Sequence, residues 1–175
     1  PNLTTDMVAV APNPPIYDPN FVPIERMPRN RDRGLHDFEG ITYTGWTPPD
    51  PDIAAGPSHI VEVTNGGIAF FSMTGDVLFE QPIEDSFGFW GEVGATDFVF
   101  DPEVIWDPHG DRFIAMACER GNSNDSYFLL AISDDTNPMG TWHKYRINVT
   151  SFDTDIDSPN LSVDDQAIYV SADFF

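Results

Sequence analysis

Basic residues are scarce in this sequence, which carries 8 Lys and Arg against 29 Asp and Glu and has a formal net charge of -21. Because no basic stretch is present to neutralise phosphates, we expect no nucleic-acid partner. An acidic surplus of this size is typical of a protein that binds divalent cations, works in a salty medium, or stays soluble through charge repulsion. Composition alone leaves these three explanations open.

Cysteine is nearly absent, and apolar runs are short. The single cysteine, Cys118, excludes an intrachain disulfide and lies in the apolar segment FIAMAC, where we expect a small buried hydrophobe. A large core needs no disulfide, so this scarcity is compatible with secretion. The sequence contains no signal peptide and no run of about 18 apolar residues. We therefore expect no membrane insertion, and a targeting sequence that is missing or already removed.

Helical periodicity is lacking too, since no capped amphipathic run of about ten residues occurs. The chain is instead rich in aromatic residues, with 14 Phe, 5 Tyr and 4 Trp, and in turn formers, with 16 Pro and 13 Gly. Aromatic residues favour strands, and Pro and Gly favour turns between them. The composition predicts an all-β fold.

Two regions differ in pattern. Residues 1–34 are rich in Pro, Asn and Arg and predict an extended N-terminal arm. Residues 35–175 contain three similar units, which begin at Asp52, Asp101 and Asp157 and continue into the β-prone runs IVEVTN, RFIAMAC and AIYVSA. Their spacing of about fifty residues is typical of β-propeller blades, each of which has four strands.

About three blades are visible, whereas a closed propeller has about four to eight. We therefore expect an incomplete ring, with the remaining blades supplied by further sequence or by another chain. Within the first unit, residues 74–76 (Thr-Gly-Asp) predict a hairpin turn between two strands.

The aspartates that begin the three units, Asp52, Asp101 and Asp157, are candidate catalytic residues. At the starts of the innermost strands of a propeller they would converge on the central channel, where carboxylates can act as acid, base or metal ligand. The alternative is that each carboxylate caps a loop by accepting backbone N–H bonds. The capping role is the preferred interpretation.

A second set of carboxylates lies in the turns WDPHGDRF and SVDDQAIY. Clustered carboxylates on short turns can bind calcium through oxygen atoms, although neither turn matches an EF-hand loop. The candidate calcium ligands are Asp107, Asp111, Asp164 and Asp165. For each residue taken singly, a solvated turn is the alternative and the preferred interpretation.

The segment Ser133 to Trp142, SDDTNPMGTW, has the residue order of a stretched Asp-box turn, for which we expect a structural role. The four histidines show no metal-binding spacing and adjoin no nucleophile motif. Four sequons would accept glycans in a eukaryotic secretory pathway; they lie at Asn2, Asn124, Asn148 and Asn160.

The segments PPDPDIAAGPSHIVEVTNGGIAFF, FDPEVIWDPHGDRFIAMA, AISDDTNPMGTWHKYRI and DSPNLSVDDQAIYVSADFF together resemble secreted microbial β-propeller proteins of poorly defined function. The resemblance extends from Asp37 to the C-terminus and brings no established catalytic set. A fainter likeness is to five-bladed glycoside hydrolases. That likeness implies that Asp52 is the base and Asp157 the modulator, while the general acid would be a Glu that cannot be assigned here.

From these features we expect a non-enzymatic binding or structural module that is secreted or on the cell surface and stabilised by calcium. Its partners would be the remaining part of the propeller or another protein chain, with glycans as a candidate class of ligand. The alternative is a glycosidase that uses the inner-strand carboxylates.

Overall fold

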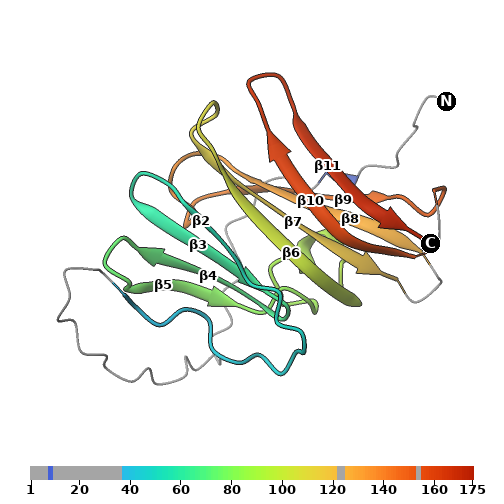
Figure 1. Cartoon of the computed structure of the whole chain (residues 1–175), viewed down its shortest axis with the longest axis horizontal. Helices are drawn as coiled ribbons and strands as arrows, with labels where there is room; N and C mark the ends of the chain where they lie inside the picture. Colours follow the sequence, from blue (N-terminus) through green and yellow to red (C-terminus); the bar gives the residue numbers. More distant parts are fainter. Residues whose placement is uncertain (1–7, 10–36, 122–124, 153–154) are drawn as a thin grey trace.

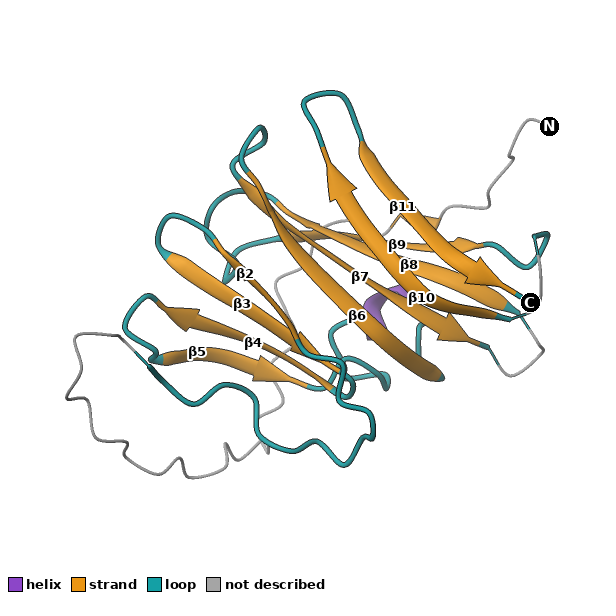
Figure 2. Cartoon of the chain, viewed as in Figure 1, coloured by secondary structure: helices purple, strands orange, loops and turns teal. Residues whose placement is uncertain are grey.

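The computed structural model describes residues 8–9, 37–121, 125–152 and 155–175. They form strands and one short 3₁₀ helix, Gly91–Val93, with no α-helix among them (Figures 1 and 2). The predicted all-β class is confirmed. The strands make three antiparallel sheets, none of which closes on itself in the described parts of the chain.

The first sheet is a four-stranded meander in chain order. It consists of β2 (Asp52–Ala55), β3 (His59–Thr64), β4 (Gly67–Ser72) and β5 (Val77–Gln81). The turn between β4 and β5 holds the predicted hairpin: the Ser72 hydroxyl accepts the N–H groups of Thr74 and Asp76, and Gly75 has a φ of 87°. Glycine suits this turn because it takes a positive φ without steric cost.

The second sheet repeats the meander with longer strands. It consists of β6 (Phe98–Asp107), β7 (Arg112–Arg120), β8 (Ser126–Ser133) and β9 (Trp142–Asn148), and the short β1 (Val8–Ala9) pairs with the outer edge of β9. The predicted arm, residues 1–34, therefore contains one two-residue strand. The rest of that arm lies outside the described residues.

The third sheet is a hairpin of β10 (Ile156–Val163) and β11 (Ile168–Phe174). The strand β6 contacts β2 on one side and β10 on the other, so the first strands of the three sheets are neighbours (Figure 1). This adjacency brings chain segments about fifty residues apart to one place.

Apolar side chains fill the space between the first two sheets. Phe70 stacks on Phe79 at 4.7 Å between ring centres and on Trp142 at 5.8 Å, and Phe89 meets Phe70 edge-on. A smaller cluster of Phe100, Cys118, Val149 and Ile156 lies toward the hairpin. Cys118 is buried, as predicted, and burial raises the pKa of its thiol.

The stretched Asp-box turn is part of this packing. Trp142 is buried, and its indole N–H donates to the carbonyl of Pro138. The Ser133 hydroxyl accepts the N–H of Phe113 and donates to the carbonyl of Asp135. These contacts tie the turn to the core, in keeping with a structural role. Among the described residues there is no helix with the length and apolarity needed to span a membrane.

Candidate ligand-binding site

Three short segments at the starts of β2, β6 and β10 share a local geometry. Each has a residue with positive φ followed by proline and then a polar residue: Asp50-Pro51-Asp52, Asp101-Pro102-Glu103 and Ser158-Pro159-Asn160. The φ values of Asp50, Asp101 and Ser158 are 42°, 49° and 49°. In β6 and β10 the strand register shifts at this point. A bulge of this kind re-aims side chains at the end of a strand.

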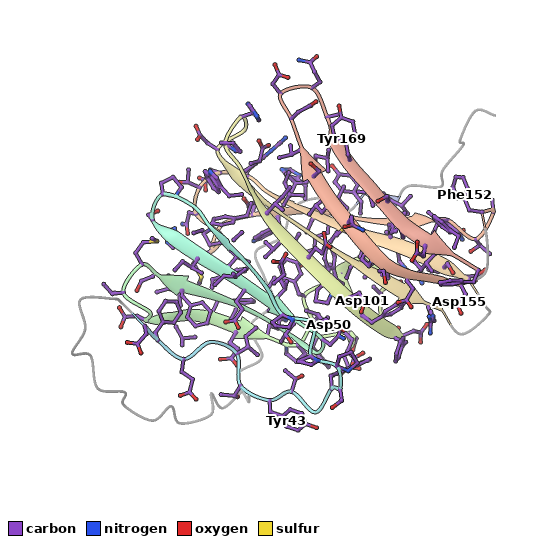
Figure 3. The ribbon with its side chains drawn as sticks, in the orientation of Figure 1. Tyr43, Asp50, Asp101, Phe152, Asp155 and Tyr169 are labelled. Carbon is purple, nitrogen blue, oxygen red and sulfur yellow. The ribbon has the colours of Figure 1, made fainter. Side chains whose placement is uncertain are left out.

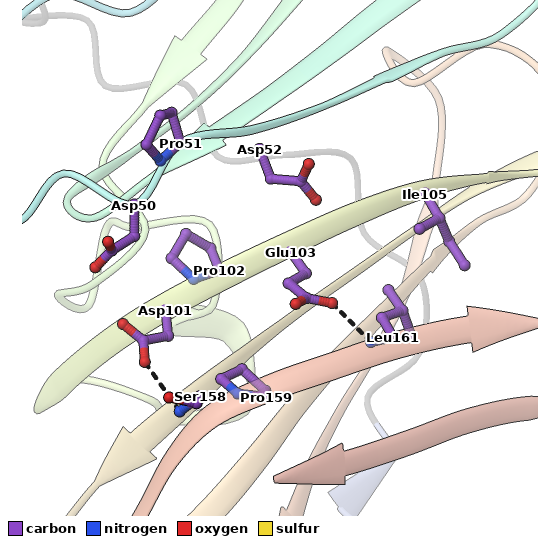
Figure 4. A pocket seen from close by; sticks show the side chains of 10 residues that line it. All are labelled: Asp50, Pro51, Asp52, Asp101, Pro102, Glu103, Ile105, Ser158, Pro159 and Leu161. Carbon is purple, nitrogen blue, oxygen red and sulfur yellow. Dashed lines mark hydrogen bonds between the residues drawn. The ribbon is translucent and has the colours of Figure 1, made fainter.

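Carboxylates of one segment cap the backbone of the next. The N–H of Val104 donates to Asp52 at 2.9 Å, and the N–H of Leu161 donates to Glu103 at 2.6 Å (Figure 4). Since Val104 and Leu161 occupy corresponding places, Glu103 is the counterpart of Asp52. The residue equivalent to Asp52 in the second unit is therefore Glu103, not Asp101 as the spacing suggested.

The candidate residues Asp101 and Asp157 meet directly. Asp101 accepts the N–H of Ser158 at 3.1 Å, and its carboxyl group is hydrogen-bonded to that of Asp157. Two carboxylates in contact can form such a bond only when one holds a proton. Burial, reinforced by Asp157, raises the pKa of Asp101 to about 6, while the bond from Ser158 acts in the opposite direction.

The third candidate, Asp52, lies beside Glu103. Burial raises the pKa of Glu103, and the negative charges of Asp52 and Asp101 add to the effect. Asp52 also accepts the N–H of Ile53 at 2.8 Å. All three candidate catalytic aspartates thus line or adjoin one region, and each accepts at least one backbone N–H bond.

Asn65, which lies between β3 and β4, joins the segments together. Its side-chain amide donates to the Asp50 carboxylate at 2.8 Å and to the carbonyl of Pro48, while its carbonyl oxygen accepts the N–H of Asp101. The side chain is buried. Asn65 therefore fixes the positions of Asp50 and Asp101 relative to each other.

Two adjoining cavities open beside these segments. One, of about 530 Å³, is lined by the residues drawn in Figure 4, among them Asp52, Asp101 and Glu103. The other, of about 480 Å³, has Asp50, Asp101 and Asp157 on its wall together with aromatic residues. Figure 3 shows Asp50 and Asp101 close together near the middle of the molecule. Both volumes are in the range of small-molecule sites, about 300 to 1,000 Å³.

The second cavity has an apolar wall, which the sequence interpretation missed. It includes Trp46, Phe98 and Phe100, with Arg120 beside them. Trp46 lies 4.9 Å from Phe98 between ring centres, and its side chain is hydrogen-bonded to the Glu84 carboxylate. Carboxylates and exposed aromatic surface are thus combined at one site.

The candidate calcium ligands do not gather. Asp107 is buried, and it accepts the N–H groups of His109 and Gly110 and the guanidinium of Arg112 at 2.9 Å. Burial alone would raise the pKa of Asp107, but these partners outweigh it and lower the pKa. With a guanidinium on one oxygen, the carboxylate does not fit a calcium ligand.

The second calcium turn has the same design. Asp164 accepts the N–H groups of Gln166 and Ala167 and the hydroxyl of Tyr169, and these bonds lower its pKa. Both turns, together with Asp111 and Asp165, are part of the described chain, in which no group of three or more potential metal-binding side chains is found. Calcium binding stays a prediction. The hydrogen bonds show that Asp107 and Asp164 cap their own turns, and Asp107 is buried, so the solvated turn that was the alternative does not describe Asp107.

The geometry limits the chemistry open to the Asp101–Asp157 pair. Glycoside hydrolysis needs two carboxyl groups about 5 to 10 Å apart, so that the sugar or a water molecule fits between them. Hydrogen-bonded carboxyl groups are closer than that. The pair can accept and donate hydrogen bonds to a ligand, but it does not flank a glycosidic bond in this arrangement.

Part of the site could have been found from the sequence. The three Pro-containing tripeptides recur at intervals of about 50 to 60 residues, and they would have added Asp50 and Glu103 to the candidates. No sequence signal points to Asn65, Trp46 or Phe98. Of the sequons, Asn148 and Asn160 are exposed, while Asn2 and Asn124 lie outside the described residues.

Comparison with known proteins adds no further constraint, because no family model, curated protein or solved structure matches this chain.

Proposed function

We propose that the chain is part of a β-propeller that acts, outside the cell or on its surface, as a non-enzymatic binding or structural module. The propeller is supported by two four-stranded meanders in chain order, whose first strands, β2 and β6, lie side by side. The hairpin β10–β11 is the first half of a third blade. Further sequence or another chain supplies the remaining blades.

The observation that carries the function is the convergence of the three strand starts on shared cavities. Asp50, Asp52, Asp101, Glu103 and Asp157 line them. In a propeller, this place is the mouth of the central channel. A ligand there would replace water on carboxylates that are already oriented by backbone N–H groups, which reduces the ordering cost of binding.

The extracellular setting rests on the acidic composition and on the resemblance to secreted propeller proteins. A net charge of -21 keeps a protein soluble by repulsion. Calcium stabilisation is part of the proposal for the same reason, since cations relieve repulsion among carboxylates.

Glycoside hydrolysis is the second candidate, and one observation favours it. A carboxyl group with a pKa of about 6, such as Asp101, has the property of a general acid near neutral pH. Asp52 or Glu103 would then be the base. The direct contact between Asp101 and Asp157 counts against this alternative, because substrate would have to separate them.

A polysaccharide screen distinguishes the two functions. The chain is incubated with insoluble and soluble polysaccharides, and both retention of protein and release of reducing sugar are measured. We expect retention without release. Release of sugar that is abolished by Asp52→Asn, with circular dichroism unchanged, would show that the protein is an enzyme.

A further inference from the structure

The cavity next to Trp46 and Phe98 combines two surfaces that differ in polarity. Phe98 has 44% of its surface exposed, although it lies next to Trp46, Phe100 and Arg120. Trp46 packs against it at 4.9 Å between ring centres, and the Trp46 side chain interacts with Glu84. The same cavity is also lined by Asp101 and Asp157, together with Asp50.

A sugar ring likewise has apolar and polar parts, with C–H groups on its faces and hydroxyl groups around its edge. Aromatic rings pack against the C–H face, and carboxylates accept hydrogen bonds from hydroxyl groups. Below about pH 6, where Asp101 holds a proton, its carboxyl group can also donate a hydrogen bond. Resting on the proposed binding function, we infer that this cavity binds a ring of a neutral saccharide, with Phe98 and Trp46 against its face and Asp50 and the Asp101–Asp157 pair on its hydroxyl groups.

The charges around the cavity argue for a neutral ligand. Asp50, Asp101 and Asp157 repel an anionic sugar or a phosphate. A cationic ligand would meet Arg120, whose guanidinium carbon lies 5.9 Å from the centre of the Phe98 ring and 4.8 Å from that of Phe100. The positive charge of Arg120 beside these rings disfavours a second cation, and Arg120 forms a half-exposed ion pair with Asp155.

The test is a titration of the 175-residue chain with neutral gluco-, xylo- and arabino-oligosaccharides, followed by calorimetry and by saturation-transfer NMR. A glucuronic-acid oligosaccharide and spermidine are the charged probes. We expect a neutral oligosaccharide to bind with an affinity that changes less than about twofold between low and high salt, because no ion pair is formed. Saturation of the aromatic protons should transfer to ring C–H protons of the sugar.

Two variants locate the site. Phe98→Ala should weaken binding about five- to tenfold through loss of the stacking surface, and Asp50→Asn should weaken it less. Asparagine tolerates the positive φ of Asp50, so this variant keeps the fold testable if Phe98→Ala does not fold. The control is Tyr43→Ala, since Tyr43 is an exposed aromatic residue outside the cavity (Figure 3), and its loss should leave the affinity within about twofold.

Each other outcome overturns a different statement. If spermidine binds with strong salt dependence and no saccharide does, the ligand class is wrong while the binding function stands. If a saccharide is bound and cleaved, the non-enzymatic function is wrong while the ligand class stands. If no neutral oligosaccharide binds, or if Tyr43→Ala weakens binding as much as Phe98→Ala, the inference is wrong.

Discussion

The second sheet contacts the first sheet on one side and the β10–β11 hairpin on the other, and the side chains at these two boundaries differ in polarity. Toward the first sheet, aromatic and aliphatic side chains such as Phe70, Phe113 and Trp142 form one continuous core. Toward the β10–β11 hairpin, the apolar cluster is small, and carboxylates of Asp101 and Glu103 bind the backbone of the hairpin. The comparison indicates that the first boundary supplies stability and that the second leaves polar groups at a cavity where a ligand can reach them.

The largest effect is expected from truncation in the apolar boundary. Phe70→Ala removes a ring that is stacked on Phe79 and Trp142, and it should lower the free energy of unfolding by about 3 to 5 kcal/mol. Ile156→Ala, in the small cluster, should cost about 2 kcal/mol. Urea unfolding measures both. Equal losses of unfolding free energy in the two variants would mean that the two boundaries contribute equally to stability.

A buried ion pair also lies at the apolar boundary, and breaking it should have the next largest effect on the free energy of unfolding. Lys144 and Glu92 are 3.1 Å apart with 3% and 9% of their side chains exposed. Burial lowers the pKa of Lys144, and Glu92 acts against that effect. Glu92→Gln leaves the buried ammonium group without a counter-charge and should cost about 3 kcal/mol.

The matched control for this variant is an exposed pair on the same strand. Asp134 and His143 are 3.1 Å apart, and 64% of the Asp134 side chain is exposed. Asp134→Asn should change the free energy of unfolding by less than about 0.5 kcal/mol. A Glu92→Gln effect as small as this one would mean that Lys144 reaches water in the native state.

Calcium should have a smaller effect, confined to the acidic turns. If the folded state alone binds calcium, a tenfold excess over Kd adds about 1.4 kcal/mol to its stability, and the melting temperature rises. The measurement compares millimolar calcium with chelator at matched ionic strength. Asp164→Asn should remove the rise if that turn holds the ion. An identical melting temperature in calcium and in chelator would show that the acidic turns are solvated or capped only.

The smallest effect concerns pH at the polar boundary. The pKa of Asp101 is raised from 3.8 to about 6 on folding, so the native state holds more protons than the unfolded state between these values. Stability from this group is therefore lost as pH rises from about 4 through 6. Asp101→Asn mimics the protonated acid and should stabilise the protein by about 1 kcal/mol at pH 8, after allowance for solvent screening, with little effect near pH 4.

Thermal unfolding of the wild-type chain and Asp101→Asn across this pH range measures the difference. Asp165→Asn, in an exposed turn, is the control and should show the same pH profile as the wild type. A constant gap between Asp101→Asn and wild type at all pH values would mean that Asp101 does not share a proton with Asp157.

The sequence predicted the all-β class because β-prone runs alternate with turn residues, and the turn at 74–76 followed from its Gly. It also singled out Asp52, Asp101 and Asp157, which the fold brings to one region. The spacing of the starting aspartates aligned Asp52 with Asp101 and missed Glu103, although the recurring tripeptides Asp50-Pro51-Asp52 and Asp101-Pro102-Glu103 align Glu103 with Asp52. The one-residue register shift in β6 is a matter of backbone geometry and could not be predicted from either pattern.

The apolar side of the site was beyond sequence reasoning for a different reason. Phe98 and Trp46 look like any core aromatic residue in the sequence, and only the structure shows that they contact each other while Phe98 stays partly exposed. The same holds for Asn65, whose role depends on carbonyl and carboxylate groups from two other segments. Contacts between distant segments are not encoded in local pattern.

The most direct test of the central claim, that the strand starts form the ligand site, is an NMR titration of the ¹⁵N-labelled chain with a bound oligosaccharide from the screen. The amide signals of Phe98, Asp101 and Ser158 report on the cavity that these residues line, and the N–H groups of Asp101 and Ser158 are held by Asn65 and Asp101. We expect these signals and those of their neighbours to shift most, while signals from the turns at Asp111 and Asp165 stay in place. Shifts concentrated at those turns, or at the β11 edge, would contradict the central claim.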